Sequence, residues 1–147
     1  MDNPSHTAMR TLERLVEALD SHDLEAVASC FAEDYRNVTP NHPQRSFQGR
    51  DQVRRNWAQL FAGVPDISAR VTRSTVDGPT VWTEWDLTGT RRDGTSFVMH
   101  GVVIYQVPED LIESATFYLE PTENLSGDVN AAIHRAVGGA RNPEEPS

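Results

Sequence analysis

The sequence predicts an α+β fold in which three helices near the N-terminus pack on one face of a curved antiparallel sheet. Up to about residue 63, apolar side chains recur at helical spacing. From residue 67 to residue 120, apolar and polar side chains alternate instead, as they do in strands. Turn-forming Gly and Pro residues separate these alternating segments, which indicates a meander of long strands.

The first helix is expected over residues 8–20, and one apolar stripe runs along it. Its members are Leu12, Leu15, Val16 and Leu19. A second helix is expected over residues 24–32, with Asp23 as its N-cap. Residues 35–48 contain two prolines and are expected to be irregular. The third helix begins near Arg50 and ends at Gly63.

Four strands and a short helix are expected after the third helix. The strands cover residues 67–76, 81–90, 96–107 and 111–120, and the helix covers residues 127–137. Residues 8–137 then form a single domain. Residues 1–7 and 138–147 are expected to be flexible tails.

Composition excludes several classes of partner. The chain has 147 residues and a net charge of -9, so neither nucleic acid nor an anionic membrane surface is an expected partner. All 13 basic residues are arginine, and they are scattered along the chain. Cys30 is the single cysteine and cannot form an intrachain disulfide. No apolar run suggests a signal peptide or a membrane span, so we expect a cytoplasmic protein.

The strand over residues 96–107 is apolar on both faces. One face carries Phe97, Met99, Gly101, Val103 and Tyr105, and the other Val98, His100, Val102, Ile104 and Gln106. An antiparallel strand with one solvated face would alternate with polar residues. We therefore expect a second copy of the chain to cover the outer face, giving a homodimer. The alternative is that the helix over residues 127–137 covers it.

Four segments resemble the nuclear transport factor 2-like superfamily, in its SnoaL-like and ketosteroid-isomerase-like branch. They are Ala18-Leu19-Asp20-Ser21-His22-Asp23-Leu24, Phe31-Ala32-Glu33-Asp34, Gly49-Arg50-Asp51-Gln52-Val53 and Trp85-Asp86-Leu87-Thr88-Gly89-Thr90. The closing strand of that family resembles the segment Phe117-Tyr118-Leu119-Glu120. The resemblance spans about residues 8–120 and implies a cone-shaped fold around a pocket. It does not select an activity, because the fold hosts isomerases, cyclases, dehydratases, epoxide hydrolases and non-enzymes.

Two activities of the family are excluded by the residues at the implied catalytic positions. The resemblance places Leu15, Thr39 and Gly101 where ketosteroid isomerases carry a tyrosine and two aspartates. Neither Leu nor Gly has a polar side chain, and a Thr hydroxyl is too weak a base to remove a carbon-bound proton. Trp85 and Phe117 fall where limonene-type epoxide hydrolases need an arginine and an aspartate of their relay.

The resemblance also implies which residues face the pocket. The polar candidates are Glu84 and Tyr118, and the expected substrate-binding set is Leu15, Leu19, Thr39, Asn56, Trp57, Leu60, Met99, Gly101, Val103 and Thr116. These residues form an apolar wall with a few polar groups, as is usual for a small-molecule site. Gly101 in mid-strand would leave room for a ligand or for a bulky neighbour.

Glu84 is the strongest candidate for a catalytic acid or base. Burial in the pocket would raise its pKa toward neutrality. The alternation of its strand supports the opposite reading, since Val81, Thr83, Trp85 and Leu87 form the more apolar face and leave Glu84 in solvent. A shift of one residue in register decides between the two.

Other polar residues are weaker candidates for a role in the pocket. Tyr118 would donate a hydrogen bond to a ligand oxygen, or would be an ordinary aromatic residue at the sheet surface. His100 is better read as an interface or core residue than as a pocket base, and His42 and Asn37 would lie near the pocket mouth. The five histidines show no metal-ligand spacing, so neither a metal nor another cofactor is expected.

The leading hypothesis is a SnoaL-like enzyme that isomerises, cyclises or dehydrates a polyketide-like or terpenoid-like small molecule without a cofactor. Glu84 would be its acid or base and Tyr118 its oxygen donor. The alternative is a non-catalytic module of the same fold that binds a hydrophobic ligand or dimerises.

Overall fold

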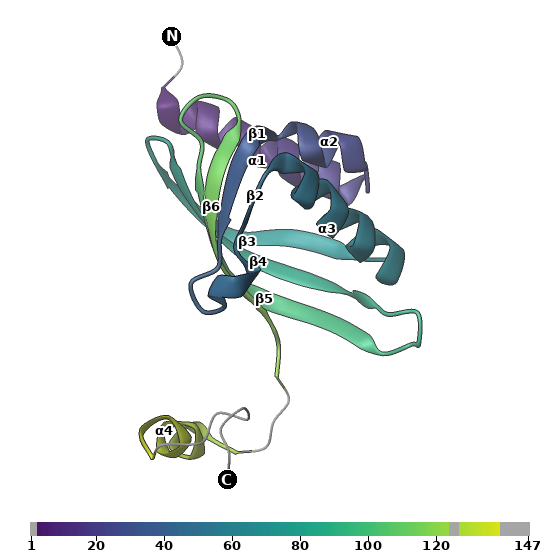
Figure 1. The fold of residues 1–147 in the computed structure, drawn as a ribbon, viewed down its shortest axis with the longest axis vertical. Helices are drawn as coiled ribbons and strands as arrows, with labels where there is room; N and C mark the ends of the chain where they lie inside the picture. Colours follow the sequence, from purple (N-terminus) through teal and green to yellow (C-terminus); the bar gives the residue numbers. More distant parts are fainter. Residues whose placement is uncertain (1–2, 124–126, 139–147) are drawn as a thin grey trace.

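Three N-terminal helices lie on one face of a six-stranded sheet that curves around them (Figure 1). The computed structural model describes residues 3–123 and 127–138. The helices are α1 (Pro4–Asp20), α2 (Leu24–Ser29), α3 (Arg50–Gly63) and α4 (Val129–Val137), with a 3₁₀ turn η1 (Pro43–Arg45). The strands are β1 (Phe31–Val38), β2 (Phe47–Gln48), β3 (Ser68–Asp77), β4 (Thr80–Thr90), β5 (Ser96–Gln106) and β6 (Ile112–Pro121).

Helix α1 begins earlier than its apolar stripe predicts. The Asn3 side chain accepts a hydrogen bond from the Ser5 amide at 2.8 Å, and Pro4 occupies the first helical turn. Both are favourable at a helix start, because the first amides of a helix lack intrahelical partners. Residues 4–7 are therefore helical, and the prediction of a loose leader over residues 1–7 is wrong for them. Residues 1–2 and 139–147 of the two predicted tails lie outside the described residues.

Helix α2 ends earlier than expected. Asp23 caps it as predicted and accepts from the Ala26 amide at 3.1 Å. The helix stops at Ser29, with Cys30 as C-cap, so Phe31 belongs to a strand and not to the inner face of a helix. Strands β1 and β2 occupy the two ends of the segment over residues 35–48 that was expected to be irregular, at residues 35–38 and 47–48. Tertiary pairing with β6 overrides the local turn signals in this segment.

The sheet is mixed and not purely antiparallel, which corrects the prediction. Its strand order is β2-β1-β6-β5-β4-β3. Strand β1 runs parallel to β6, and all other neighbouring strands are antiparallel. The meander from β3 to β6 is confirmed. The parallel pair arises because β1, formed early in the chain, docks beside the last strand of the meander.

The turn between α1 and α2 is tied to the other layers through His22. This residue has a left-handed backbone, with φ of 51°. Its ring stacks on Phe61 of α3 with centroids 4.5 Å apart. Its Nε2 atom lies 2.8 Å from the Ile67 carbonyl at the start of β3. One side chain thus fixes the end of α1 relative to both α3 and the sheet.

The concave face of the sheet carries the core. On β4 the buried residues are Val81, Thr83, Trp85 and Leu87, which is the face that the alternation predicted. The polar members of this face are satisfied internally: Trp85 Nε1 donates to Thr83 Oγ1 at 2.8 Å, and Thr83 Oγ1 donates to the Val103 carbonyl at 2.7 Å. These bonds remove the cost of burying a hydroxyl and an indole N–H.

The convex face of the sheet is partly apolar and open in this single chain. Trp82 is 49% exposed and Tyr118 is 39% exposed on it. Helix α4 does not cover this face: its Val129, Ile133 and Val137 are all exposed, and it lies beyond the end of the sheet (Figure 1). No helix in the described part of the chain is long and apolar enough to cross a membrane.

Gly101 is required by the close approach of β5 to β6. A Cβ atom at this position would collide with the Tyr118 carbonyl oxygen and would lie 2.6 Å from the Leu119 Cα. Its φ of 156° is also one that side-chain-bearing residues rarely adopt. Gly101 therefore gives room to the backbone of the neighbouring strand, and not to a ligand or to a bulky side chain as was expected.

We expect Gly101→Ala to destabilise the fold by about 1–3 kcal/mol, because the added methyl group must push β6 away from β5. Chemical denaturation monitored by tryptophan fluorescence measures this loss. The matched control is Gly63→Ala at the end of α3, where a Cβ atom would meet nothing within 4 Å. Equal stability of the two variants would contradict the role assigned to Gly101.

Stability should fall in alkali because two core tyrosines are held neutral. Burial raises the pKa of Tyr35 well above its ordinary value of 10.0 and also raises the pKa of Tyr105. Between the unfolded and folded pKa values the native state binds more protons, so the free energy of unfolding decreases as pH rises past about 10. Denaturation midpoints measured from pH 8 upward test this. Tyr105→Phe should give a shallower decline, and an unchanged slope would contradict the assignment.

Candidate functional site

A cavity of about 300 Å³ lies between α3 and the concave face of the sheet. Its volume is at the lower end of the range of small-molecule pockets, roughly 300–1,000 Å³. Most of its wall is apolar. Its apolar residues include Trp57 and Leu60 from α3, Leu87 from β4, Met99 from β5, and Phe117 and Leu119 from β6. Such a wall favours a hydrophobic ligand with few polar groups.

One side of the cavity carries a chain of hydrogen-bonded polar groups. The Tyr35 hydroxyl donates to Asn37 Oδ1 at 2.7 Å, and Asn37 Nδ2 donates to Thr39 Oγ1 at 3.2 Å. The three residues alternate along β1 and its continuation, so they share one face. Thr39 accepts within this chain, which leaves its own hydroxyl proton available to a ligand oxygen. Burial raises the pKa of Tyr35, so this side of the cavity stays neutral.

The mouth of the cavity carries charge. Glu120, at the end of β6, lies 2.8 Å from His42 Nε2 through Oε1 and 3.9 Å from Arg45 Nη1 through Oε2. Glu120 and Arg45 both line the cavity. The side chains of His42 and Glu120 are 38% and 34% exposed, so solvent reaches the pair. A carboxylate and an imidazole in hydrogen-bond contact can accept a proton from a bound molecule or return one to it.

Helix α3 adds one polar group to the wall. Asn56 accepts a hydrogen bond from Gln52 Nε2 at 2.7 Å through its Oδ1. Asn56 can therefore offer a ligand its amide N–H groups, which suit a carbonyl or hydroxyl oxygen.

Half of the predicted substrate-binding residues line this cavity. They are Thr39, Asn56, Trp57, Leu60 and Met99. Leu15, Leu19 and Val103 are buried in the hydrophobic core instead, and Gly101 lies in the sheet beside them. Thr116 lies on the convex face, because it pairs with Ile104 and alternates with the inward-facing Ala115 and Phe117. No ligand contact is assigned to these five residues.

Glu84 does not face the cavity, and the expectation that it would be a buried acid is wrong. It lies on the convex face, where its Oε2 atom is 2.5 Å from Arg73 Nη2. The hydrogen bond from Arg73 lowers the pKa of Glu84, which is the opposite of the shift that a pocket acid would need. The inward positions of β4 are filled by Thr83 and Trp85 on either side of it. The alternation pattern was therefore correct, and the register implied by the resemblance was wrong.

Tyr118 also lies on the convex face, opposite Val102 of β5. It is 39% exposed and does not line the cavity. His100 lies on the same face, with its Nδ1 atom 2.6 Å from Asp86 Oδ1. Alternation explains both placements, since the neighbouring Phe117 and Leu119 point into the cavity.

Sequence reasoning placed Thr39 in the pocket and Asn37 and His42 near its mouth, but it missed Tyr35, Arg45 and Glu120. Tyr35, Asn37 and Thr39 recur at every second residue, which is a strand signal, but Pro40 and Pro43 nearby favoured an irregular reading. Arg45 and Glu120 are far apart in the sequence and give no local signal. Among the described residues, no three His, Cys, Asp or Glu side chains come together as a metal site would require.

Solved structures with the same fold include proteins named for several different reactions. A proposed ketosteroid isomerase from Kribbella flavida is 24% identical, with a TM-score of 0.65 over 86% of this chain and 85% of that one. A proposed SnoaL-like polyketide cyclase from a Jannaschia species is 17% identical, with a TM-score of 0.68 over 91% and 94%. An LEH-like epoxide hydrolase from M. tuberculosis is 16% identical, with a TM-score of 0.67 over 79% and 84%.

These identities establish the fold and not the reaction. No curated protein matches the sequence. The sequence profile of the SnoaL-like domain matches residues 12–115, which is most of the chain and includes α2, α3, β1 to β5 and the first four residues of β6. The arrangement of three helices on a curved six-stranded sheet agrees with that match, and the chain belongs to the SnoaL-like domain family.

Proposed function

We propose that the protein is a cofactor-independent enzyme that binds a hydrophobic small molecule in the cavity and changes it by acid–base chemistry. The observation that carries this proposal is the position of Glu120, a carboxylate at the mouth of a mostly apolar cavity and in contact with His42. Isomerisation, cyclisation or dehydration of a polyketide-like or terpenoid-like substrate would each use such a pair. The structural neighbours named above include proteins assigned to isomerase and cyclase functions, which supports this range.

Each part of the site has a role in this proposal. The apolar wall around Trp57 and Met99 would hold the hydrocarbon part of the substrate. The neutral chain that ends at Thr39 would orient a substrate oxygen through one hydrogen bond. Glu120 would remove or return a proton, and His42 would hold the carboxylate in position and share the proton. Glu84 and Tyr118 have no role in this reaction, because neither side chain reaches the cavity.

The reaction differs from that of ketosteroid isomerases and limonene-type epoxide hydrolases. The positions that the resemblance assigns to their catalytic residues hold Leu15, Thr39 and Gly101 in one case, and Trp85 and Phe117 in the other. Leu15 and Trp85 are buried in the core. The acid–base group must therefore come from another part of the cavity, and Glu120 is the carboxylate that lines it.

We expect the protein to accelerate exchange of the α-protons of a bicyclic ketone, 2-tetralone, with deuterium in D₂O. Glu120→Gln should reduce this acceleration about 100-fold or more, since the amide cannot accept the proton. NMR spectroscopy follows the loss of the α-proton signal directly.

The matched controls are Glu84→Gln and Glu113→Gln, which remove one carboxylate each from exposed positions outside the cavity. Both should exchange like the unmodified protein. Full activity of Glu120→Gln, or loss of activity in Glu84→Gln, would contradict the assignment.

A second candidate is a non-catalytic module that binds a hydrophobic ligand. It is favoured by the exposure of the His42–Glu120 pair, because water competes with a bound ligand for contact with an exposed carboxylate. This candidate predicts that 2-tetralone binds, as seen by quenching of tryptophan fluorescence, while its α-protons exchange at the rate measured without protein.

We also propose that the convex face of the sheet is the interface of a homodimer. Support comes from the half-buried Val102 and Ile104 at the centre of β5, flanked by the exposed Trp82 and Tyr118. Such a mixture of aromatic and branched side chains with polar residues at the edge is typical of an interface. Helix α4 leaves this face open, which removes the alternative cover considered from the sequence.

Val102→Glu should convert a dimer to a monomer, because the charge would be buried without a partner at the centre of the interface. Sedimentation velocity at several protein concentrations measures the change. Val137→Glu introduces the same charge on the exposed face of α4 and should leave the oligomeric state unchanged. Dimerisation of the Val102→Glu variant, or a monomeric unmodified protein, would exclude this interface.

A further inference from the structure

The polar side chains in the cavity wall have hydrogen-bonding atoms that the protein itself leaves unused. Asn37 and Thr39 line the cavity from β1 and its continuation and are only 7% and 9% exposed. Asn56 lines it from α3 and is half-buried. A buried polar atom without a partner costs free energy, so the unused atoms determine which ligand groups the cavity favours.

The direction of the hydrogen bonds along β1 is fixed by Tyr35. This residue is 1% exposed, and among the described residues its hydroxyl has Asn37 as its single hydrogen-bond partner. If the hydroxyl accepted from Asn37, its own proton would be buried without an acceptor, so it donates to Asn37 Oδ1 at 2.7 Å. The Asn37 amide nitrogen then faces Thr39 and donates one of its two hydrogens to Oγ1 at 3.2 Å. Within residues 3–123 and 127–138, the second amide hydrogen of Asn37 and the hydroxyl proton of Thr39 have no acceptor.

The direction of the hydrogen bond at Asn56 is fixed by Arg55. A guanidinium group has donors only, so the Gln52 atom that lies 2.7 Å from Arg55 Nη2 is the carbonyl oxygen Oε1. Gln52 therefore turns its amide nitrogen toward Asn56 and donates to Oδ1 at 2.7 Å. In the described part of the chain, neither hydrogen of the Asn56 amide has an acceptor.

The interior of the cavity therefore offers unused hydrogens from two different elements. Each of the side-chain oxygens of Asn37, Thr39 and Asn56 already accepts a hydrogen bond, whereas each of these side chains keeps at least one free proton. The carboxylate of Glu120, in contrast, stands at the mouth, where solvent reaches it. A ligand in this cavity meets donors inside and an anionic acceptor at the entrance.

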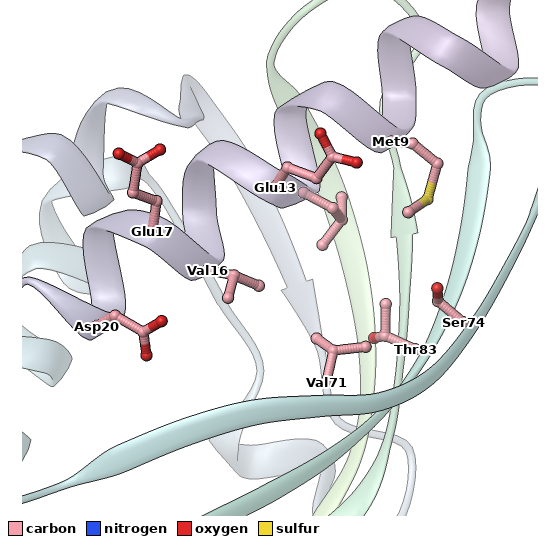
Figure 2. Close-up of a pocket in the computed structure, with 9 residues that line it drawn as sticks. Met9, Glu13, Val16, Glu17, Asp20, Val71, Ser74 and Thr83 are labelled. Carbon is pink, nitrogen blue, oxygen red and sulfur yellow. The ribbon is translucent and has the colours of Figure 1, made fainter.

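A second hollow of the molecule, between α1 and strands β3 and β4, lacks this property. Its volume is about 360 Å³, and Figure 2 shows Met9 and Val16 of α1 facing Val71 and Thr83 of the sheet. Thr83 is the buried polar residue among those that line it, and its hydroxyl both accepts and donates a hydrogen bond within the sheet. This hollow therefore has no buried group left over to orient a ligand.

We propose that Asn37 and Thr39 make the cavity selective for hydrophobic molecules whose buried oxygen is a carbonyl, with Tyr35 as the positioning residue that orients the Asn37 amide. A carbonyl oxygen accepts hydrogen bonds and brings no proton of its own, so it matches a wall of unused donors. A hydroxyl or an amine would bring a proton to a place where each oxygen already has a partner. The inference rests on the proposed function in one respect, that the cavity binds a hydrophobic small molecule, and it holds whether or not Glu120 transfers a proton.

The first test compares three bicyclic molecules of nearly equal size by quenching of tryptophan fluorescence, to which Trp57 in the cavity wall contributes. They are 2-tetralone, 2-tetralol, which has a hydroxyl in place of the carbonyl, and tetralin, which has no oxygen. We expect the ketone to bind about tenfold more tightly than the other two, because tetralin leaves the donors unpaired and the alcohol adds an unpaired proton. Equal affinities for the ketone and the alcohol would overturn this selectivity and leave the proposed function standing. Absence of binding by all three would overturn both.

The second test uses matched threonine variants. Thr39→Val keeps the shape of the side chain and removes the free donor, so the preference for 2-tetralone over tetralin should fall from about tenfold to about threefold or less. Thr11→Val removes the hydroxyl of an equally buried threonine on α1, which donates to the Thr7 and Asp110 carbonyls and lies outside the cavity. This control should keep the full preference. The same preference in both variants would contradict the role of Thr39.

The third test examines the positioning role of Tyr35 with 2-tetralone labelled with carbon-13 at its carbonyl. Hydrogen bonds from the cavity wall should move the carbonyl NMR signal downfield of its position in an apolar solvent. Tyr35→Phe frees the Asn37 amide to rotate, so the signal should return part of the way, as it should in Thr39→Val. Glu120→Gln should leave the signal in place while it slows proton exchange, which separates recognition from the reaction. A signal that neither Tyr35→Phe nor Thr39→Val moves would overturn the proposal.

Discussion

The close approach of β5 to β6 at Gly101 is the constraint on which the rest of the structure depends. The backbone of β6 occupies the space where a Cβ atom would lie, so the two strands can bend together toward the helices. Gly101 lies two residues after Met99 on β5 and directly opposite Leu119 on β6, and both Met99 and Leu119 line the cavity. The curvature of the sheet at this point sets the distance between the walls. A side chain here would change the shape of the cavity without touching a ligand.

Polar groups are distributed unevenly around the cavity, and this distribution shapes its chemistry. The buried side has the neutral chain from Tyr35 to Thr39, in which the Tyr35 hydroxyl donates to Asn37 and the Asn37 amide donates to Thr39. The mouth has the charged group of His42, Arg45 and Glu120, where water can solvate the charges. A hydrophobic molecule would therefore enter with its reactive end near the mouth or with one oxygen near Thr39. Charge is kept out of the interior, where it would be costly to bury.

The outer surfaces of the molecule also divide by chemistry. The convex face of the sheet is apolar at its centre, with the Arg73–Glu84 and His100–Asp86 pairs on it. On the opposite side of the sheet, helix α1 packs over the concave face, and its outward surface carries Glu13, Glu17 and Asp20. With a net charge of -9, the chain has an excess of acid that few local arginines offset.

The sequence by itself determined the α+β class, the meander from β3 to β6, the capped start of α2 at Asp23, and the inward face of β4. Each of these depends on local periodicity or on a cap, which the nearest residues along the chain decide. Tertiary structure alone decided that β1 forms and pairs with β6, because that pairing joins segments about 80 residues apart. It also decided that Glu120 and His42, and not Glu84, stand at the cavity. A strand's alternation tells which residues share a face, but only packing against the helices decides which atoms meet across the cavity.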